Sequence, residues 1–137
     1  MRTQKLTKAF FAIPDDQDKT EFEIKHLRAG ESSDIAKETH VQRFEFRKDE
    51  NDEMTPVPLM EINTVKENEM SNIAALVGWK NVFDEDGEEL PYTPKNKVKF
   101  FKKLSSENYI FALSFIADQR EILAEKIEKQ EKKALGN

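Results

Sequence analysis

The sequence predicts an α+β fold, with a small antiparallel β-sheet from the N-terminal half packed with several helices and a long amphipathic C-terminal helix. Three observations predict it: early segments alternate apolar and polar residues, helix-capping patterns follow, and an apolar seam runs through the C-terminal segment. We expect a single domain over residues 1–137. It would have a β-rich front half (1–50), a linker and edge segment (51–63), and a helical back half (64–137) with a charged end.

The first predicted elements form a β-hairpin. An apolar run from Leu6 to Ile13 is followed by a proline and an acidic turn. The next segment, TEFEIKHL, alternates apolar and charged residues, which predicts a second strand. One face of this strand would carry Phe22, Ile24 and His26.

A short helix and a third strand are predicted next. Gly30 interrupts the strand pattern, and Ser32 or Ser33 can cap a helix formed by SSDIAKET. The segment HVQRFEFRK then alternates again and places Phe44 and Phe46 on one side.

The middle of the chain is predicted to be a linker, an edge segment and a helix. KDENDEMTP is charged and is expected to be a mobile linker. Pro56 and Pro58 lack an N–H group, which confines PVPLMEI to a sheet edge or to irregular structure. Thr64 with Glu67 three residues later fits a capping box, so we expect a helix whose apolar stripe ends at Gly78.

Two further helices complete the prediction. Thr93-Pro94 is typical of an N-cap followed by proline at the first helical position, so KNKVKFFKKL should be helical and should bury Val98 and Phe101. The last helix would begin at a serine cap, Ser105 or Ser106, and its seam has spacings of four and three. The seam consists of Tyr109, Leu113, Ile116, Arg120, Leu123 and Ile127.

The role of this seam is open between packing on the chain's own core and contact with a partner or a second copy of the chain. A helix of about 25 residues would be about 38 Å long, more than the width of a domain of this size, so part of it should overhang. The residues that we expect to bind a partner are Leu113, Ile116, Leu123 and Ile127.

The stretch VGWKNVFDEDGEELPYTPKNKV concentrates rigid residues around an acidic loop. A calcium loop aligned on Gly87 would place Val82 and Thr93 at positions that need acidic ligands, so an EF-hand is excluded. A turn with Gly87 at positive φ is predicted instead, while weak divalent binding by the loop acids Asp84, Glu85, Asp86, Glu88 and Glu89 stays open. We expect Trp79, Phe83 and Tyr92 to pack over the following helix. The residues with a structural role are Trp79, Gly87, Pro91, Tyr92, Thr93 and Pro94.

The composition narrows the class of protein. The chain has a net charge of −5, no cysteine and two histidines, so we expect no cofactor, no metal and no nucleic-acid partner. No nucleophile stands beside a base and no glycine-rich phosphate loop is present, so we expect no enzyme activity. Because no apolar run could span a bilayer or act as a signal peptide, we expect a cytoplasmic protein without a membrane partner.

The same stretch resembles the C-terminal half of small tail assembly chaperones of long-tailed bacteriophages. FAIPDD and EFEIKHLRAGE resemble the opening hairpin of that group. The lysine-rich KVKFFKKL and the long charged C-terminal helix depart from its pattern. The matching residues are Trp79, Val82, Asp84, Asp86, Gly87, Leu90, Pro91, Tyr92, Thr93, Pro94 and Asn96.

The resemblance implies a chaperone that binds the long helical tape-measure protein, assists assembly of the tail-tube protein, acts in the cytoplasm of the bacterial host and is absent from the finished virion. Two alternatives stay open. One is a structural tail or head-tail component retained in the virion, and the other is an acidic decoy that occupies a DNA-binding protein.

Overall fold

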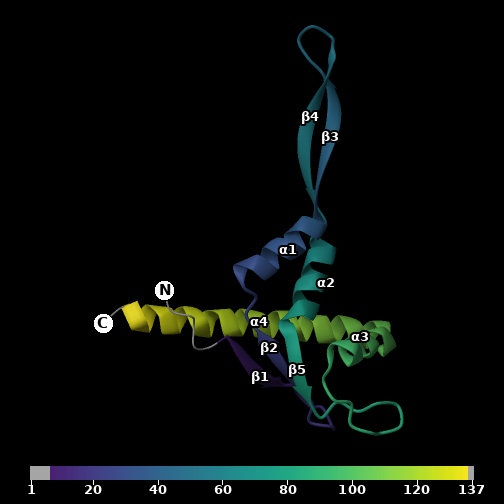
Figure 1. The fold of residues 1–137 in the computed structure, drawn as a ribbon, viewed down its shortest axis with the longest axis vertical. Coiled ribbons are helices and arrows are strands. Elements are labelled where there is room, and N and C mark those ends of the chain that lie inside the picture. The colour runs from purple at the N-terminus through teal and green to yellow at the C-terminus, as the bar shows by residue number, and fades with distance from the viewer. Residues whose placement is uncertain (1–6, 136–137) are drawn as a thin grey trace. The chain divides into compact units, whose positions relative to one another are not determined.

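The computed structural model describes residues 7–135 and confirms the mixed α+β fold (Figure 1). The chain divides into two compact units, one of Met1–Leu27 with Asn72–Asn137 and the other of Arg28–Ser71. The elements in chain order are β1 (Lys8–Ala12), β2 (Glu21–Lys25), α1 (Ala29–Thr39), β3 (His40–Lys48), β4 (Met54–Ile62), α2 (Thr64–Ala75), β5 (Leu76–Lys80), α3 (Pro94–Lys103) and α4 (Ser106–Leu135).

The first unit is built on a three-stranded antiparallel sheet in the order β1-β2-β5. The predicted hairpin of β1 and β2 is confirmed, although Leu6, where we expected the apolar run to begin, lies outside the described residues. Phe22 and Ile24 are buried as the alternation predicts. The prediction for His26 is wrong: the strand ends at Lys25, so the alternation stops there and the His26 side chain is exposed.

Strand β5 occupies a segment that we predicted as the end of a helix. Helix α2 ends at Ala75, and Leu76–Lys80 then pairs antiparallel with β2. This pairing buries Leu76 and Trp79, and that burial outweighs the helical spacing of the apolar residues. Gly78 suits the strand because a Cβ atom there would lie 2.7 Å from Glu23 Oε1.

Aromatic side chains join the sheet of the first unit to its helices. The ring of Phe22 meets those of Phe100 and Phe115 edge-on, each at a centroid distance of 6.0 Å. Phe101 is buried as predicted, whereas Val98 is exposed. Helix α3 therefore packs on the unit through Phe100 and Phe101. The prediction that Val98 is buried is wrong.

The second unit contains α1, which begins earlier than the sequence predicts. Its N-cap is Arg28, whose backbone N–H donates to Glu31 Oε1 at 3.1 Å, so neither Ser32 nor Ser33 is the cap. Gly30 lies inside the first turn instead of interrupting the chain before the helix. A carboxylate in the first turn satisfies a free N–H and favours the helix dipole, which explains the earlier start.

Residues 51–63, expected to be a linker and an edge segment, form most of a turn and the whole second strand of a long hairpin. Strands β3 and β4 have nine residues each and pair antiparallel along their full length (Figure 1). Asp49 Oδ1 accepts the N–H groups of Asn51 and Glu53 at 2.8 and 3.0 Å, which fixes the turn. Pro56 and Pro58 do lie in an edge strand, as their missing N–H groups require.

Candidate functional site

The register of the β3–β4 hairpin gathers most of its apolar side chains on one face. Phe44 lies opposite Pro58, and Phe46 lies opposite Pro56. Side chains alternate between faces along a strand, and directly opposite residues point to the same face. This surface, called the apolar hairpin face below, consists of Phe44, Phe46, Met54, Pro56, Pro58, Met60 and Ile62.

The apolar hairpin face is open to solvent. Phe44, Phe46 and Met60 have exposed fractions of 61%, 62% and 64%. Soluble proteins rarely leave so many large apolar side chains together in water, and such patches mark sites of protein interaction. The face is therefore the best candidate for a functional surface among the described residues.

The opposite face of the same hairpin carries charges. Arg43 Nε lies 2.6 Å from Glu61 Oε2, and Arg47 Nη2 lies 2.8 Å from Glu45 Oε2. Such exposed pairs add little stability. They do make the hairpin amphipathic, because this face carries four charged side chains and the apolar hairpin face carries only Lys48, at its end. Removal of the charged face from water would therefore cost much more hydration of charge.

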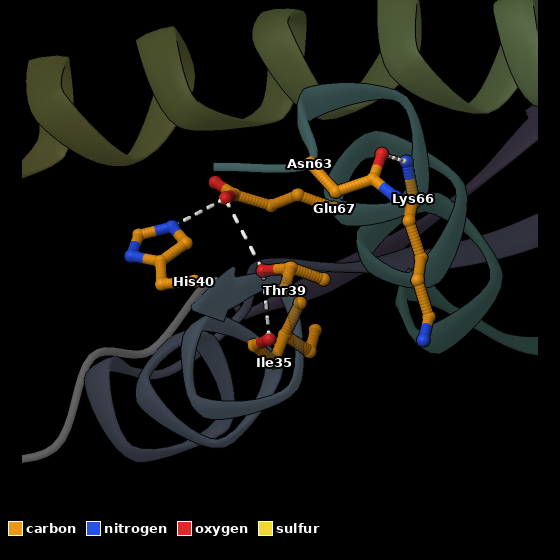
Figure 2. Close-up of polar contacts among 6 residues, drawn as sticks. All are labelled: Ile35, Thr39, His40, Asn63, Lys66 and Glu67. Atoms are coloured by element: carbon orange, nitrogen blue, oxygen red, sulfur yellow. Dashed lines mark hydrogen bonds and ion pairs between the residues drawn. The ribbon is translucent and has the colours of Figure 1, made fainter. Parts of the chain in front are cut away.

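A polar cluster holds the start of β3 to the first turn of α2 (Figure 2). The Glu67 carboxylate lies 2.7 Å from His40 Nε2 and 3.4 Å from Thr39 Oγ1. Thr39 is buried, and its hydroxyl also reaches the Ile35 carbonyl at 2.9 Å. This hydroxyl has a single proton to donate, and the shorter distance indicates that it donates to the Ile35 carbonyl and not to Glu67. The cluster connects α1, β3 and α2 inside the second unit.

The cap of α2 differs from the predicted capping box. Asn63 Oδ1 accepts the Lys66 N–H at 3.1 Å, so Asn63 is the cap in place of Thr64 (Figure 2). Asparagine is among the strongest N-cap residues, and Glu67 is used instead in the contact with His40.

The predicted turn around Gly87 is confirmed in the first unit. Gly87 has a φ of 78°, and the Leu90 N–H donates to the Val82 carbonyl at 2.7 Å, so the two arms fold back on each other. Asp84 Oδ1 accepts the N–H groups of Asp86 and Glu88 at 2.9 and 3.0 Å. This carboxylate therefore stabilises the turn. Within residues 7–135, no group of three or more His, Cys, Asp or Glu side chains could hold a metal ion.

The remaining structural residues of this stretch join the turn to α3. Trp79 Nε1 donates to the Leu90 carbonyl at 2.7 Å, and its ring meets Tyr92 edge-on at 5.0 Å. Thr93 caps α3 by accepting the Asn96 N–H, with Pro94 in the first turn as predicted. Pro91 contributes its carbonyl, which accepts Asn96 Nδ2 at 2.9 Å. Phe83, which we expected in this cluster, is 41% exposed.

A buried carbonyl at the start of β5 receives two donors. Lys97 Nζ and Tyr92 Oη lie 2.7 and 3.1 Å from the Leu76 carbonyl oxygen. Burial, reinforced by the charge of Lys25, lowers the pKa of Lys97 to about 8. Burial and the charge of Glu23 raise the pKa of Tyr92. Both shifts indicate a site that disfavours charge.

The stability of the protein should respond to the titration of Lys97. Its pKa is about 8 in the folded chain against an ordinary 10.5, so the unfolded chain binds more protons between these values and stability rises with pH there. Relative to Lys97→Met, the free energy of unfolding of the native protein should rise between about pH 8 and about pH 10, by on the order of 1–2 kcal/mol after allowance for partial exposure. Urea denaturation at several pH values measures this difference. Tyr92 is present in both proteins, so a difference that stays flat with pH would contradict the assignment.

The residues predicted to bind a partner lie mostly inside the first unit. Ile116, Leu123 and Ile127 are buried with exposed fractions of 4% or less, and Leu113 is partly buried. These three buried side chains hold α4 in the core of the unit. Arg120, the polar member of the seam, is half-buried and donates to Asn72 Oδ1 at 2.9 Å. Partner binding by the seam stays a prediction, and in this structure most of its surface is already covered.

Other side chains of α4 do face solvent. Ile110, Phe111 and Ile122 are exposed large apolar residues that the seam pattern did not single out. The cap of α4 is Ser105, whose Oγ accepts the Asn108 N–H at 3.2 Å.

None of the helices formed by residues 7–135 is long and apolar enough to cross a membrane.

Comparison with known proteins places the chain in a family. A family model described as YdaY prophage protein matches residues 29–137, which includes the hairpin, the Gly87 turn and both C-terminal helices. No curated protein and no solved structure matches the chain. Because the family model covers most of the sequence, the chain belongs to the YdaY prophage protein family.

Proposed function

We propose that this prophage protein is a non-enzymatic tail assembly chaperone that binds the tape-measure protein and assists assembly of the tail tube in the host cytoplasm. The observation that carries the proposal is the exposed apolar hairpin face. Its support from the sequence is the resemblance of the Gly87 turn and its flanks to such chaperones. The family match supports a phage protein in general.

The dimensions and chemistry of the apolar hairpin face suit an apolar helical partner. A strand of nine residues is about 30 Å long, which corresponds to between five and six turns of an α-helix. Met54 and Met60 are flexible and can adapt to different side chains along a helix. A chaperone that must later leave its client needs such adaptable contacts more than a rigid, highly specific pocket.

The proposal is tested with a variant that makes the apolar hairpin face polar. Phe44→Ser, Phe46→Ser and Met60→Ser in one chain should weaken binding to the tape-measure protein by at least about tenfold, because aromatic anchors dominate such interfaces. Co-expression should then leave the tape-measure protein insoluble, as measured by its fraction in the cleared lysate.

A matched control changes the other face of the same hairpin. Val57 and Leu59 lie on the charged face, so Val57→Ser with Leu59→Ser should leave the tape-measure protein soluble. Equal solubility with both variants would refute the role of the apolar hairpin face. Mass spectrometry of purified virions tests the alternative that the protein is a structural component retained in the virion. Detection of multiple copies in the particle would support that alternative and contradict the chaperone proposal.

A further inference from the structure

The two outer edges of the β3–β4 hairpin differ in their capacity to accept another strand. In an antiparallel ladder, hydrogen-bonded pairs alternate with pairs whose N–H and C=O groups point outward. Asn63 N–H donates to the Thr39 carbonyl and Asp49 N–H donates to the Glu53 carbonyl, both at 2.9 Å. Both bonds join odd-numbered residues that are directly opposite each other in the β3–β4 register, so the odd-numbered pairs are the hydrogen-bonded ones. The backbone N–H and C=O groups of the even-numbered residues therefore point outward.

The outer edge of β4 is blocked and that of β3 is open. On β4, the outward positions include Pro56 and Pro58, which have no N–H to donate. On β3, the outward positions include Gln42, Phe44 and Phe46, which each retain a donor and an acceptor. Every β3 residue after His40 is exposed. Natural proteins protect edges that must not pair, so protection of one edge alone indicates that the other is used.

We propose that β3 pairs antiparallel with β3 of a second copy of this chain, about a two-fold axis at Phe44, to give a four-stranded sheet in the order β4-β3-β3-β4. This inference is independent of the proposed function, because it uses the strand edge and leaves the apolar hairpin face free. A two-fold axis perpendicular to the sheet keeps the apolar faces of both hairpins on one side.

The sequence of β3 is complementary to itself in this register. Phe44 is the middle residue of His40–Lys48, so all nine residues find a partner. Arg43 then lies directly opposite Glu45 of the partner subunit, and Glu45 lies opposite Arg43 of the partner subunit. Two pairs of opposite charges thus meet across the new strand pair, on the charged face of both hairpins.

The proposed dimer would stabilise the two-stranded hairpin and would leave no unprotected strand edge. A two-stranded sheet is marginally stable in water, and three or more strands with an apolar face are needed for independent stability. After pairing, both outer strands are β4, and their prolines prevent addition of a further strand. The assembly therefore closes as a dimer and does not extend into a fibre.

The test exchanges the two charges. Sedimentation velocity of the full chain over a range of concentrations should show a dimer. Arg43→Glu and Glu45→Arg each place like charges opposite each other twice, so each should raise the dimer dissociation constant by about tenfold. A mixture of the two variants restores both opposite-charge pairs and should form a heterodimer with nearly native affinity. If a substitution acted only by disturbing the fold of its own subunit, mixing the two variants could not restore association. Failure of the mixture to associate would therefore overturn the proposed register.

A second pair of variants tests the strand edge itself. Gln42 and Met60 are cross-strand partners, and the N–H groups of both point away from the other strand. Gln42→Pro blocks the β3 edge and should abolish the dimer, whereas Met60→Pro adds a proline to an edge that is already blocked and should leave it intact. Circular dichroism checks that both variants keep the hairpin. A purely monomeric native protein, or a dimer that survives Gln42→Pro in the folded protein, would overturn the proposal.

Discussion

Leu123→Asp should unfold the protein. The Leu123 side chain is completely buried in the first unit, where Ile116 and Ile127 lie one or two helical turns away on the same side of α4. Loss of the leucine side chain alone costs about 2–5 kcal/mol, and a buried carboxylate without a partner adds a penalty of several kcal/mol. Natural proteins are stable by about 5–15 kcal/mol, so this change removes a large part of the total or all of it.

The buried polar groups of the native chain show why a carboxylate would not be accommodated at Leu123. Within the described residues, no buried side-chain nitrogen or oxygen lacks a hydrogen-bond partner. The half-buried Arg120 on the same helix meets this requirement through Asn72, but the aspartate would lie among apolar side chains. Circular dichroism and urea denaturation should show loss of helix and of the cooperative transition.

The neighbouring residue provides the control. Ile122 is 41% exposed, so Ile122→Asp should change the free energy of unfolding by less than about 1 kcal/mol. A Leu123→Asp protein with native stability would contradict the burial of α4 in the core. The contrast also governs the interpretation of binding experiments, because loss of partner binding in an unfolded Leu123→Asp protein says nothing about an interface on the seam.

Elements with strong local signals could be predicted from the sequence. The β1–β2 hairpin follows from an apolar run, a proline-containing turn and an alternating second segment. Helix α3 follows from Thr93 and Pro94, whose capping roles depend on neighbouring residues only. Positive φ at Gly87 is likewise a local property of a turn. Short-range hydrogen bonds determine these features, so the segment itself contains the necessary information.

Elements that depend on distant partners were predicted poorly. The apolar residues Ile73, Leu76 and Val77 fit a helix spacing, but pairing with β2 decides in favour of a strand from Leu76. For β4, the charges suggested a linker as far as Pro56, and the prolines suggested an edge or irregular segment beyond it. Met54, Pro56, Pro58 and Met60 occupy every second position, as the phenylalanines of β3 do, but the apolar Val57 and Leu59 between them hide this period of two. The apolar hairpin face becomes visible only when these two alternations are placed in register.

The seam of α4 shows a further limit of sequence patterns. Helical spacing correctly identified Ile116, Leu123 and Ile127 as one apolar side of the helix. The same spacing is expected whether the side contacts the chain's own sheet or another protein. Choosing between them requires the burial of each side chain, which depends on the sheet formed by residues far away in the sequence.

Phe22→Ala should have the second-largest effect on stability. Phe22 is 1% exposed and joins the sheet to both helices through its edge contacts with Phe100 and Phe115. Truncation of a buried phenylalanine costs about 3–5 kcal/mol, because it removes apolar burial and leaves a cavity that close-packed neighbours fill only in part. Urea denaturation followed by the fluorescence of Trp79, which lies opposite Phe22 across β2 and β5, measures the change.

Phe10 on β1 is the matched control for this substitution, since it belongs to the same sheet and is 39% exposed. The Lys80 ammonium lies 4.1 Å from the centroid of its ring, and exposed contacts of this kind contribute about 0.5–1 kcal/mol. Phe10→Ala should therefore cost less than about 1.5 kcal/mol. Equal losses for the two variants would mean that the helices do not cover the Phe22 side of the sheet. A clear difference would instead locate the core of the first unit where Phe22, Phe100 and Phe115 meet.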